Sequence, residues 1–217
     1  PVKTAAYGVS VENLKVTYDE GETLTYPNFT IKPGEKVLLT GDSGTGKSTL
    51  FKALLEKIET KCGKITYFDK ESRPITNASL GYLPQDPIVF PISIKDNITM
   101  FVKRTEKQLM NVINNVELKN DLDKMPSGID TEVNLKKNNL SGGQRQKIVL
   151  ARSEIYHQPF VLMDEVTSAI DQKATEEIIT ALLKTDQTIL MIAHNFTPEL
   201  RAKFDQEIKL AKKGEEE

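Results

Sequence analysis

The sequence has little of what secreted and membrane-spanning proteins depend on. Its one cysteine, Cys62, cannot form an intramolecular disulfide or a cysteine-based structural metal site, so we expect a reducing compartment. The longest apolar runs, residues 160–163 and 189–193, are far shorter than the roughly 18 residues of a membrane span. No basic segment followed by an apolar one marks a signal peptide at the N-terminus.

An excess of charge of one sign is also lacking. The 217 residues include 29 Lys and Arg and 31 Asp and Glu, a net charge of −2. This balance argues against a protein that binds nucleic acid by bulk charge. The hydrophobic share of 38% and the charged share of 28% are ordinary for a soluble globular protein of one large domain or two small ones.

Strands and helices alternate along most of the chain, which predicts a parallel α/β core. Predicted strands cover residues 9–18, 28–32, 36–40, 63–68, 80–83, 160–163 and 188–193, and predicted helices cover residues 47–58, 142–157, 173–183 and 197–203. Between residues 92 and 122 apolar side chains recur at helical spacings with no strand between them, which predicts a helical insert. We therefore expect one domain over residues 1–217, with a core subdomain at about 1–86 and 159–217 and a helical subdomain at about 87–158.

A glycine-rich loop lies between the predicted strand 36–40 and the helix that follows it. Its glycines let the backbone turn N–H groups inward around a phosphate, and the start of the helix adds a positive dipole end. Lys47 supplies a charge for the β- and γ-phosphate oxygens, and the Ser48 hydroxyl can bind Mg²⁺. We predict that the chain binds a nucleotide here, through Gly41, Asp42, Ser43, Gly44, Thr45, Gly46, Lys47, Ser48 and Thr49.

Two adjacent carboxylates end the predicted strand 160–163. A buried strand that delivers an acidic side chain at its carboxyl end is how phosphate-loop proteins hold the Mg²⁺ shell, here through Asp164. Glu165 could accept a proton from an attacking water. The pair is informative because it lies downstream of a phosphate loop.

A second glycine motif, residues 140–144, decides the family. It opens the predicted helix 142–157, and Asp164 follows its last residue by 20 positions (164 − 144). This order of motifs resembles the nucleotide-binding domain of ABC transporters, from about residue 9 to residue 210. The resemblance implies the ABC ATPase fold: a phosphate-loop NTPase core with a mostly parallel sheet and helices on both faces, N-terminal antiparallel strands and an inserted helical subdomain. It also implies that a partner's ATP meets the signature residues Leu140, Ser141, Gly142, Gly143 and Gln144.

The resemblance assigns roles to further residues. Gln85 matches the glutamine loop, which touches Mg²⁺ and faces the membrane domains. Ser168 and Asp171 match the loop that crosses the dimer seam. His194 matches the switch histidine, which resembles a γ-phosphate sensor that holds Glu165 and the water in place. The implied catalytic set is therefore Lys47, Gln85, Glu165 and His194, and the implied Mg²⁺ ligands are Ser48, Gln85 and Asp164.

One aromatic residue is expected to stack on adenine. Tyr18, which ends the first predicted strand 23 residues (41 − 18) before the phosphate loop, resembles that aromatic, and Tyr26 is its rival. The other histidine, His157, matches no motif and is expected at a helix end.

Two segments resemble those of exporter-type ABC transporters: residues 84–98, after the glutamine loop, and residues 128–133, just before the signature. Such domains usually follow a membrane domain in one polypeptide, so we expect the chain, which begins at Pro1, to come from a longer protein. Asn195 departs from the family pattern, in which Arg often follows the switch histidine. The catalytic set is complete.

The function implied by the resemblance is ATP hydrolysis that drives substrate across a membrane, with export as the expected direction. Two nucleotide-binding domains would close head to tail around ATP and Mg²⁺ at the cytoplasmic face of a membrane, joined to a transmembrane domain and without nucleic acid. The alternative is an ABC-type clamp on DNA or the ribosome. The 92 positions (140 − 48) between Ser48 and Leu140 hold no sustained heptads, and the chain has only one cassette, which argues against that alternative. A small-molecule kinase would leave residues 140–144 unexplained.

Overall fold

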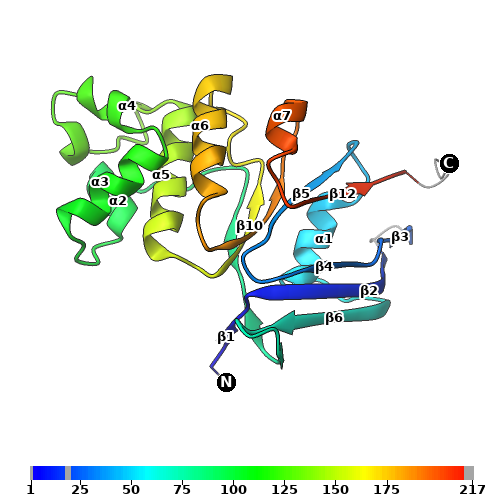
Figure 1. Cartoon of the computed structure of the whole chain (residues 1–217). Helices are drawn as coiled ribbons and strands as arrows, with labels where there is room; N and C mark the ends of the chain where they lie inside the picture. The colour runs from blue at the N-terminus through cyan, green and yellow to red at the C-terminus, as the bar shows by residue number, and fades with distance from the viewer. Residues whose placement is uncertain (1, 18–20, 213–217) are drawn as a thin grey trace. The chain divides into compact units, whose positions relative to one another are not determined.

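The computed structural model describes residues 2–17 and 21–212 (Figure 1). The chain forms two compact units. Unit 1 consists of Pro1–Tyr82, Pro159–Asp164 and Asp186–Glu217, and unit 2 consists of Leu83–Gln158 and Glu165–Thr185.

Unit 1 is built around a five-stranded sheet in the order β12-β5-β11-β10-β9. Its strands are β5 (Lys36–Gly41), β9 (Gly81–Leu83), β10 (Phe160–Asp164), β11 (Thr188–Ile192) and β12 (Gln206–Leu210). Parallel pairing joins β11 to β5 and to β10, and β12 to β5. Every residue of β11 is buried, as expected of a continuous apolar strand inside a parallel sheet. Four of the strands were predicted; β12 was not, because its short polar–apolar alternation follows a helix without a clear turn signal.

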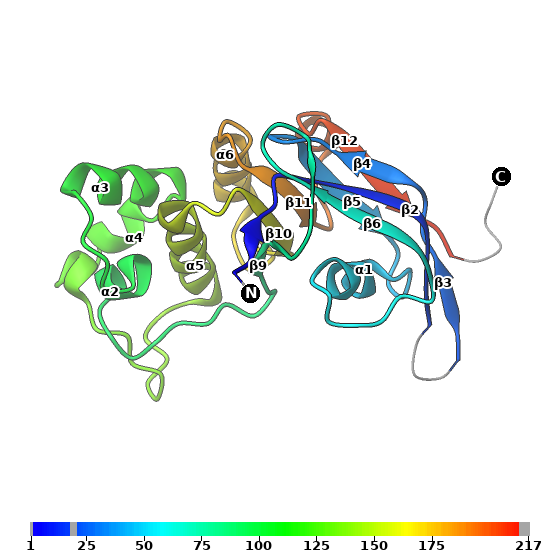
Figure 2. The ribbon, with the colours of Figure 1, turned by 90° about the horizontal axis from the view of Figure 1, so that it is seen from below.

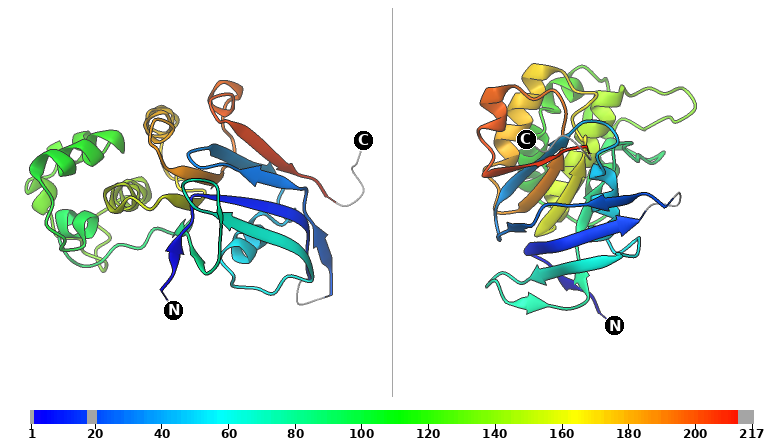
Figure 3. Two further views of the ribbon diagram at one scale, coloured as in Figure 1. Left: turned by 60° about the horizontal axis from the view of Figure 1, so that its bottom comes forward. Right: turned by 90° about the vertical axis from the view of Figure 1, so that its right-hand side faces the viewer.

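An antiparallel sheet completes the strands of unit 1. Its central strand is β2 (Gly8–Thr17), which pairs with β3 (Thr23–Thr25), β4 (Phe29–Ile31) and β6 (Cys62–Phe68). Figure 3 shows β2 and β6 side by side. The short strand β7 (Pro74–Ile75) pairs antiparallel with β6, and β1 (Thr4–Ala5) pairs in parallel with β8 (Ala78–Ser79). The predicted N-terminal antiparallel strands are therefore confirmed.

Helix α1 (Lys47–Leu54) is shorter than the helix predicted over residues 47–58, so the prediction was wrong for its last residues. The N–H of Glu56 donates to the Ala53 oxygen (3.0 Å), and the N–H of Lys57 donates to the Lys52 oxygen (2.8 Å). This pair of bonds closes a helix when the residue after the cap is left-handed, and Glu56 has a φ of 56°. Glycine is usual at that position, so the sequence carried no sign of the helix end.

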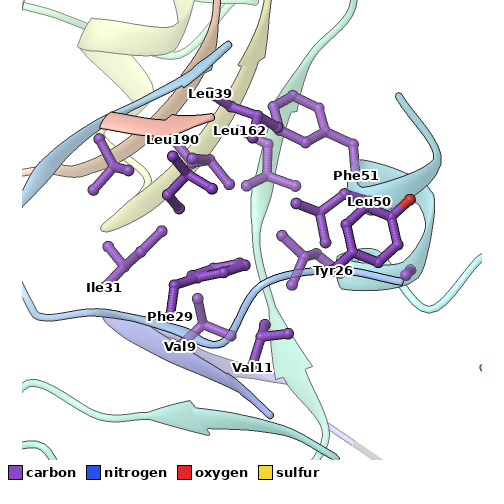
Figure 4. Packing of buried hydrophobic residues seen from close by; sticks show 14 of the residues in the cluster. Val9, Val11, Tyr26, Phe29, Ile31, Leu39, Leu50, Phe51, Leu162 and Leu190 are labelled. Atoms are coloured by element: carbon purple, nitrogen blue, oxygen red, sulfur yellow. The ribbon is translucent and has the colours of Figure 1, made fainter. Parts of the chain in front are cut away.

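One hydrophobic core joins α1 to both sheets of unit 1 (Figure 4). In Figure 2, α1 lies beside the parallel strands and beside β2 and β6. The core includes the fully buried or nearly buried side chains Val9, Val11, Ile31, Leu39, Leu50, Phe51, Leu162 and Leu190. Each such side chain contributes about 1.5–3 kcal/mol to folding by burial. This packing fixes α1, and with it the loop before α1, against β5. The unit also contains the short helix α7 (Pro198–Arg201).

Unit 2 is helical, which confirms the predicted insert. Its helices are α2 (Ile94–Thr99), α3 (Glu106–Asn115), α4 (Lys119–Asp123), α5 (Gly142–Tyr156) and α6 (Gln172–Leu182), with a 3₁₀ turn at Gly128–Asp130. Thr105 caps α3 through a reciprocal pair of hydrogen bonds with Gln108. His157 ends α5 with a φ of 56°, at the helix end where it was expected. No helix among the described residues is long and apolar enough to cross a membrane.

The grouping of residues 165–185 differs from the division expected from the sequence, which assigned them to the core subdomain. In the structure they belong to unit 2 with the helical insert. Helix α6 contacts α3, and Gln146 of α5 donates a hydrogen bond to the Ser168 hydroxyl (3.0 Å). These contacts are tertiary and leave no local mark in the sequence, and the subdomain boundaries expected from the sequence stay a prediction.

Candidate nucleotide-binding site

The glycine-rich loop joins β5 to the first turn of α1, as predicted. The Lys47 ammonium donates to the main-chain oxygens of Gly41 (2.5 Å) and Asp42 (2.9 Å), so the lysine folds back over the loop. The Thr45 hydroxyl also donates to the Asp42 oxygen (2.8 Å). Ser48 is exposed in the first turn of α1. The first N–H groups of a helix have no acceptor within the helix, so this turn is suited to bind an anion.

The phosphate loop needs a glycine at its first position because β12 passes close to the backbone there. Gly41 has a φ of 146°, and a Cβ there would lie 2.5 Å from the Leu210 oxygen and 2.8 Å from the Thr45 hydroxyl. Any side chain would therefore displace the loop from the sheet. Ser43 and Gly44 of the loop are exposed, and Thr49, in the first turn of α1, is buried.

Two more predicted site residues lie at the carboxyl edge of the same sheet. Asp164 is the last residue of β10 and pairs in register with Ile192, the last residue of β11. His194 follows two positions later and is exposed. Carboxyl ends of parallel strands meet at one edge, where ligands of open α/β sheets bind. Burial raises the pKa of Tyr82. The negative charge of the nearby Asp164 carboxylate raises the pKa of Tyr82 further.

Asn195, the departure from the family pattern, has a local explanation. Its φ is 61°, in the left-handed region. Asparagine adopts that region more readily than most residues, so it suits the turn after His194.

Glu165, which begins the second segment of unit 2, has a left-handed backbone with a φ of 50°. Its main-chain oxygen accepts hydrogen bonds from the N–H of Ser168 (3.2 Å) and from the side-chain amide of Gln146 (3.3 Å). Left-handed conformations cost on the order of 1 kcal/mol for such a residue and persist at functional sites where neighbours hold them. Gln146 is buried in α5, and no sequence motif marks it as a functional residue.

The signature residues begin α5. The Ser141 hydroxyl accepts from the N–H of Gln144 (3.1 Å), and the Gln144 side-chain oxygen accepts from the N–H of Ser141 (2.9 Å). This capping box leaves the N–H groups of Gly142 and Gly143 at the exposed start of the helix. Leu140 is buried and anchors the turn. Ser141 is therefore the N-terminal cap of α5, as its residue type allows. Asp171 is the N-terminal cap of α6, where its carboxylate accepts from the N–H of Ala174 (2.9 Å).

Gln85 is exposed in unit 2, in a segment fixed by two buried or half-buried side chains. Asn97 is fully buried, accepts from the N–H of Phe90 (2.8 Å) and donates to the Phe90 oxygen (3.0 Å). Arg152 donates to the oxygens of Ile88 (2.8 Å) and Asn97 (2.7 Å). Ile88 and Phe90 nevertheless keep exposed side chains. The segment after Gln85 is thus rigid in its backbone and apolar on its surface.

The expected adenine-stacking residue, Tyr18, lies outside the described residues. Its rival Tyr26 is buried, with 4% of its surface exposed, and its hydroxyl donates to the Gly46 oxygen (2.8 Å). A ring enclosed in this way is not available to stack on a base, so Tyr26 is excluded from that role.

The donor atoms of unit 1 fit a magnesium ion bound together with phosphates. No cluster of three or more His, Cys, Asp or Glu side chains suited to a metal lies within residues 2–17 and 21–212. Mg²⁺ at phosphate sites needs fewer protein ligands, because substrate phosphates and waters supply most of its shell. Ser48 and Asp164 offer the hard oxygen atoms that such an ion prefers; Gln85 belongs to unit 2.

Comparison with known proteins identifies the family. The family model described as ABC transporter matches residues 24–168. The chain belongs to the ABC transporter family. The match spans the phosphate loop, the glutamine loop, the signature and the Asp164–Glu165 pair.

The relatives of this ABC transporter chain include transport/processing ATP-binding proteins of bacteria. The mesentericin-Y105 transport/processing ATP-binding protein MesD of Leuconostoc mesenteroides is 36% identical over 180 residues, which cover 78% of this chain and 24% of MesD. The transport/processing ATP-binding protein ComA of Streptococcus pneumoniae is 32% identical over 81% of this chain and 25% of ComA. This chain thus spans about a quarter of the length of these relatives.

A solved structure confirms the fold. A bacterial Atm1-family ABC exporter with ATP bound matches 97% of this chain and 38% of its own, with a TM-score of 0.79 and 26% identity. The predicted ABC ATPase fold, with its α/β core, antiparallel strands and helical insert, is therefore confirmed. As a member of this family, the chain is an ATP-binding domain.

Proposed function

We propose that this chain hydrolyses ATP and uses the reaction to drive transport, with export as its direction, across a membrane. The observation that carries the proposal is the presence of a formed phosphate loop and a capped signature helix in one chain. Its relatives are transport/processing ATP-binding proteins, and its fold matches that of an ABC exporter. These relatives favour transport over the clamp on DNA or the ribosome.

The phosphates of ATP would bind at the turn between β5 and α1. The N–H groups of the loop and of the first turn of α1 would donate to phosphate oxygens, and Lys47 would turn its ammonium from loop carbonyls to the β- and γ-phosphates. Ser48, Asp164 and Gln85 would hold Mg²⁺, which neutralises charge on the phosphates when bound. Tyr18 would stack on the adenine.

Water attack on the γ-phosphate would depend on residues that follow β10 and β11. The Glu165 carboxylate would orient the water and accept its proton. His194 would hold Glu165 and the water in line with the phosphate. The hydrogen bonds on the Glu165 main-chain oxygen support this role, because they fix the backbone that carries the carboxylate.

A second nucleotide-binding domain would complete the site. Ser141, Gly142 and Gly143 would present the start of α5 to ATP on the partner's phosphate loop, and Ser168 and Asp171 would lie along the seam. ATP binding would close the pair, and hydrolysis would open it. The partner is a second copy or a different half.

A transmembrane domain would be the other partner, with this chain at the cytoplasmic face. The exposed Gln85, with Ile88 and Phe90 after it, would receive that domain. Exposed apolar side chains held on a fixed backbone are typical of protein contact sites.

The test is light scattering of Glu165→Gln with and without Mg–ATP. The variant should bind ATP without hydrolysing it, so the mass should move from that of one chain, 24.3 kDa, to that of two when ATP is added. Phosphate release should fall at least about a hundredfold against the parent chain. Glu199→Gln, an exposed change on α7, is the control and should retain activity.

The outcomes separate the parts of the proposal. Failure of the parent chain to bind ATP would refute nucleotide-driven function. A Glu165→Gln chain that binds ATP yet stays a monomer would refute closure by the chain alone, and a dimer unaffected by Ser141→Arg would refute the role of the signature at the seam.

A further inference from the structure

Two buried tyrosines bind the two ends of α1. The Tyr26 hydroxyl donates to the Gly46 oxygen (2.8 Å) at the start of the helix, and the Tyr67 hydroxyl donates to the Leu54 oxygen (2.5 Å) at its end. Both rings belong to the core of unit 1, with 4% and 7% of their surfaces exposed. Burial raises the pKa of Tyr67, with a further contribution from the charge of Glu56, so its hydroxyl keeps its proton and remains a donor. Only the first of these contacts touches the phosphate loop.

Tyr26 is held in place from the antiparallel sheet. It directly follows β3, and its own N–H donates to the Leu14 oxygen of β2 (3.1 Å). Figure 4 shows its ring beside Leu50, with the hydroxyl directed at α1. The loop is therefore supported from behind by a residue outside the motif.

The Gly46 oxygen is one end of the peptide that starts α1. It accepts from Tyr26 and also from the N–H of Leu50 (3.0 Å), the first bond of the helix. In a trans peptide the carbonyl and the following N–H point in opposite directions, so the Lys47 N–H points away from the helix, to the side where an anion binds. Both acceptor bonds fix this orientation, and hydrogen bonding to the oxygen polarises the N–H at the other end.

The packing behind Gly46 leaves no room for a side chain at this position. A Cβ on Gly46 would lie 2.7 Å from Leu24 Cδ1 and 2.8 Å from the Tyr26 hydroxyl, and the glycine has a φ of 96°. The third glycine of the loop is thus required by β3 and Tyr26 as well as by its own backbone conformation.

We propose that Tyr26 is a positioning residue of the nucleotide site, whose hydroxyl holds the Gly46–Lys47 peptide in the orientation that binds phosphate. The proposal rests on the proposed binding of ATP by this loop. Without the hydroxyl, the free loop samples other orientations of the peptide, and nucleotide binding must select the competent one. The affinity for nucleotide therefore falls, although Tyr26 itself makes no hydrogen bond to the phosphates.

The experiment compares Tyr26→Phe with Tyr67→Phe by calorimetric titration with Mg–ADP, which reports phosphate binding without hydrolysis. Both changes remove one buried hydroxyl that donates to an end of α1, so their losses of stability in urea should be similar. Tyr26→Phe should bind Mg–ADP about three- to tenfold more weakly than the parent chain, and Tyr67→Phe within about twofold of it.

Equal affinities for the two variants would overturn the proposal while leaving the proposed function intact. A parent chain that binds neither Mg–ADP nor Mg–ATP would overturn both. If Tyr26→Phe does not fold, the parent chain labelled with 3-fluorotyrosine serves instead: the ¹⁹F resonance of Tyr26 should move on adding Mg–ADP, and that of Tyr67 should not. A Tyr26 resonance that stays in place would overturn the proposal.

Discussion

Gln146 connects the signature helix to Ala169 in the loop after Glu165. Its side-chain oxygen accepts from the N–H of Ala169 (2.9 Å), and its amide donates to the Ser168 hydroxyl (3.0 Å) and the Glu165 oxygen (3.3 Å). This one buried side chain therefore fixes two segments to α5. They are the backbone of Glu165, the predicted catalytic residue, and the loop at Ser168 that is predicted to lie along the dimer seam. Since the signature begins the same helix, these three elements of unit 2 should move as one body.

Gln146→Leu should slow ATP hydrolysis at saturating ATP by at least about tenfold, because small displacements of a reacting group cost that much. Binding of Mg–ADP should stay within about twofold of the parent value, since the phosphate loop belongs to unit 1 and keeps its contacts. Steady-state phosphate release and calorimetric titration measure the two quantities.

Gln187→Leu is the matched control, because Gln187 is also buried but lies in unit 1, before β11. Gln187→Leu should not show the combination expected of Gln146→Leu, which is slower ATP hydrolysis with unchanged affinity for Mg–ADP. A Gln146→Leu chain with normal turnover would show that Glu165 is placed without this contact.

The glycines of the signature should differ in their effect on stability. A Cβ on Gly143 would lie 2.7 Å from the Ala169 oxygen, whereas the nearest atom to a Cβ on Gly142 is the Ala169 methyl at 3.3 Å. Gly143→Ala should lower the free energy of unfolding by about 1–3 kcal/mol, because the helix start must move off the loop. Gly142→Ala should change it by less than about 1 kcal/mol, since the gain in helix propensity offsets the contact.

Urea unfolding of the two variants provides the comparison. Equal losses would contradict the close approach of α5 to Ala169.

The positions of the loop and the carboxylate pair in the fold could be predicted because their signals are contiguous. The phosphate loop sits between an apolar strand and a helix, and Asp164 ends an apolar run, so local sequence placed both. The contact of Tyr26 with the loop and that of Gln146 with Ser168 were not predicted, because the partners lie 20 and 22 residues away and the bonds exist only after the sheets and helices have packed.

The early end of α1 was missed for a related reason. Glu56 takes a left-handed conformation that sequence patterns reserve for glycine, so α1 ends early. Residues 165–185 group with unit 2, where α6 contacts α3, and no linker in the sequence marks this grouping.

Asn97 should be a large contributor to the stability of unit 2. Asn97→Ala removes the partners of the Phe90 N–H and oxygen, and one acceptor of Arg152. Buried groups left without partners cost about 1–3 kcal/mol each, so the free energy of unfolding should fall by about 2–4 kcal/mol in urea. Asn114→Ala, on the exposed side of α3, should stay within about 0.5 kcal/mol of the parent value. A small effect at Asn97 would mean that water replaces its bonds.

Glu154 should make unit 2 less stable as the pH rises. Burial raises its pKa above the ordinary 4.5, although the Asn115 amide, which donates to its oxygen (2.5 Å), and the nearby His157 oppose the rise. Between 4.5 and the raised value the folded chain holds more protons than the unfolded chain, so the free energy of unfolding falls with increasing pH across that window.

Glu154→Gln keeps an acceptor for Asn115 and cannot ionise. Relative to the parent chain, it should gain stability in urea titrations as the pH rises above 4.5. Glu59→Gln, an exposed change in unit 1, should show no such gain, and a Glu154→Gln chain whose advantage does not grow with pH would contradict the cost of burying the carboxylate.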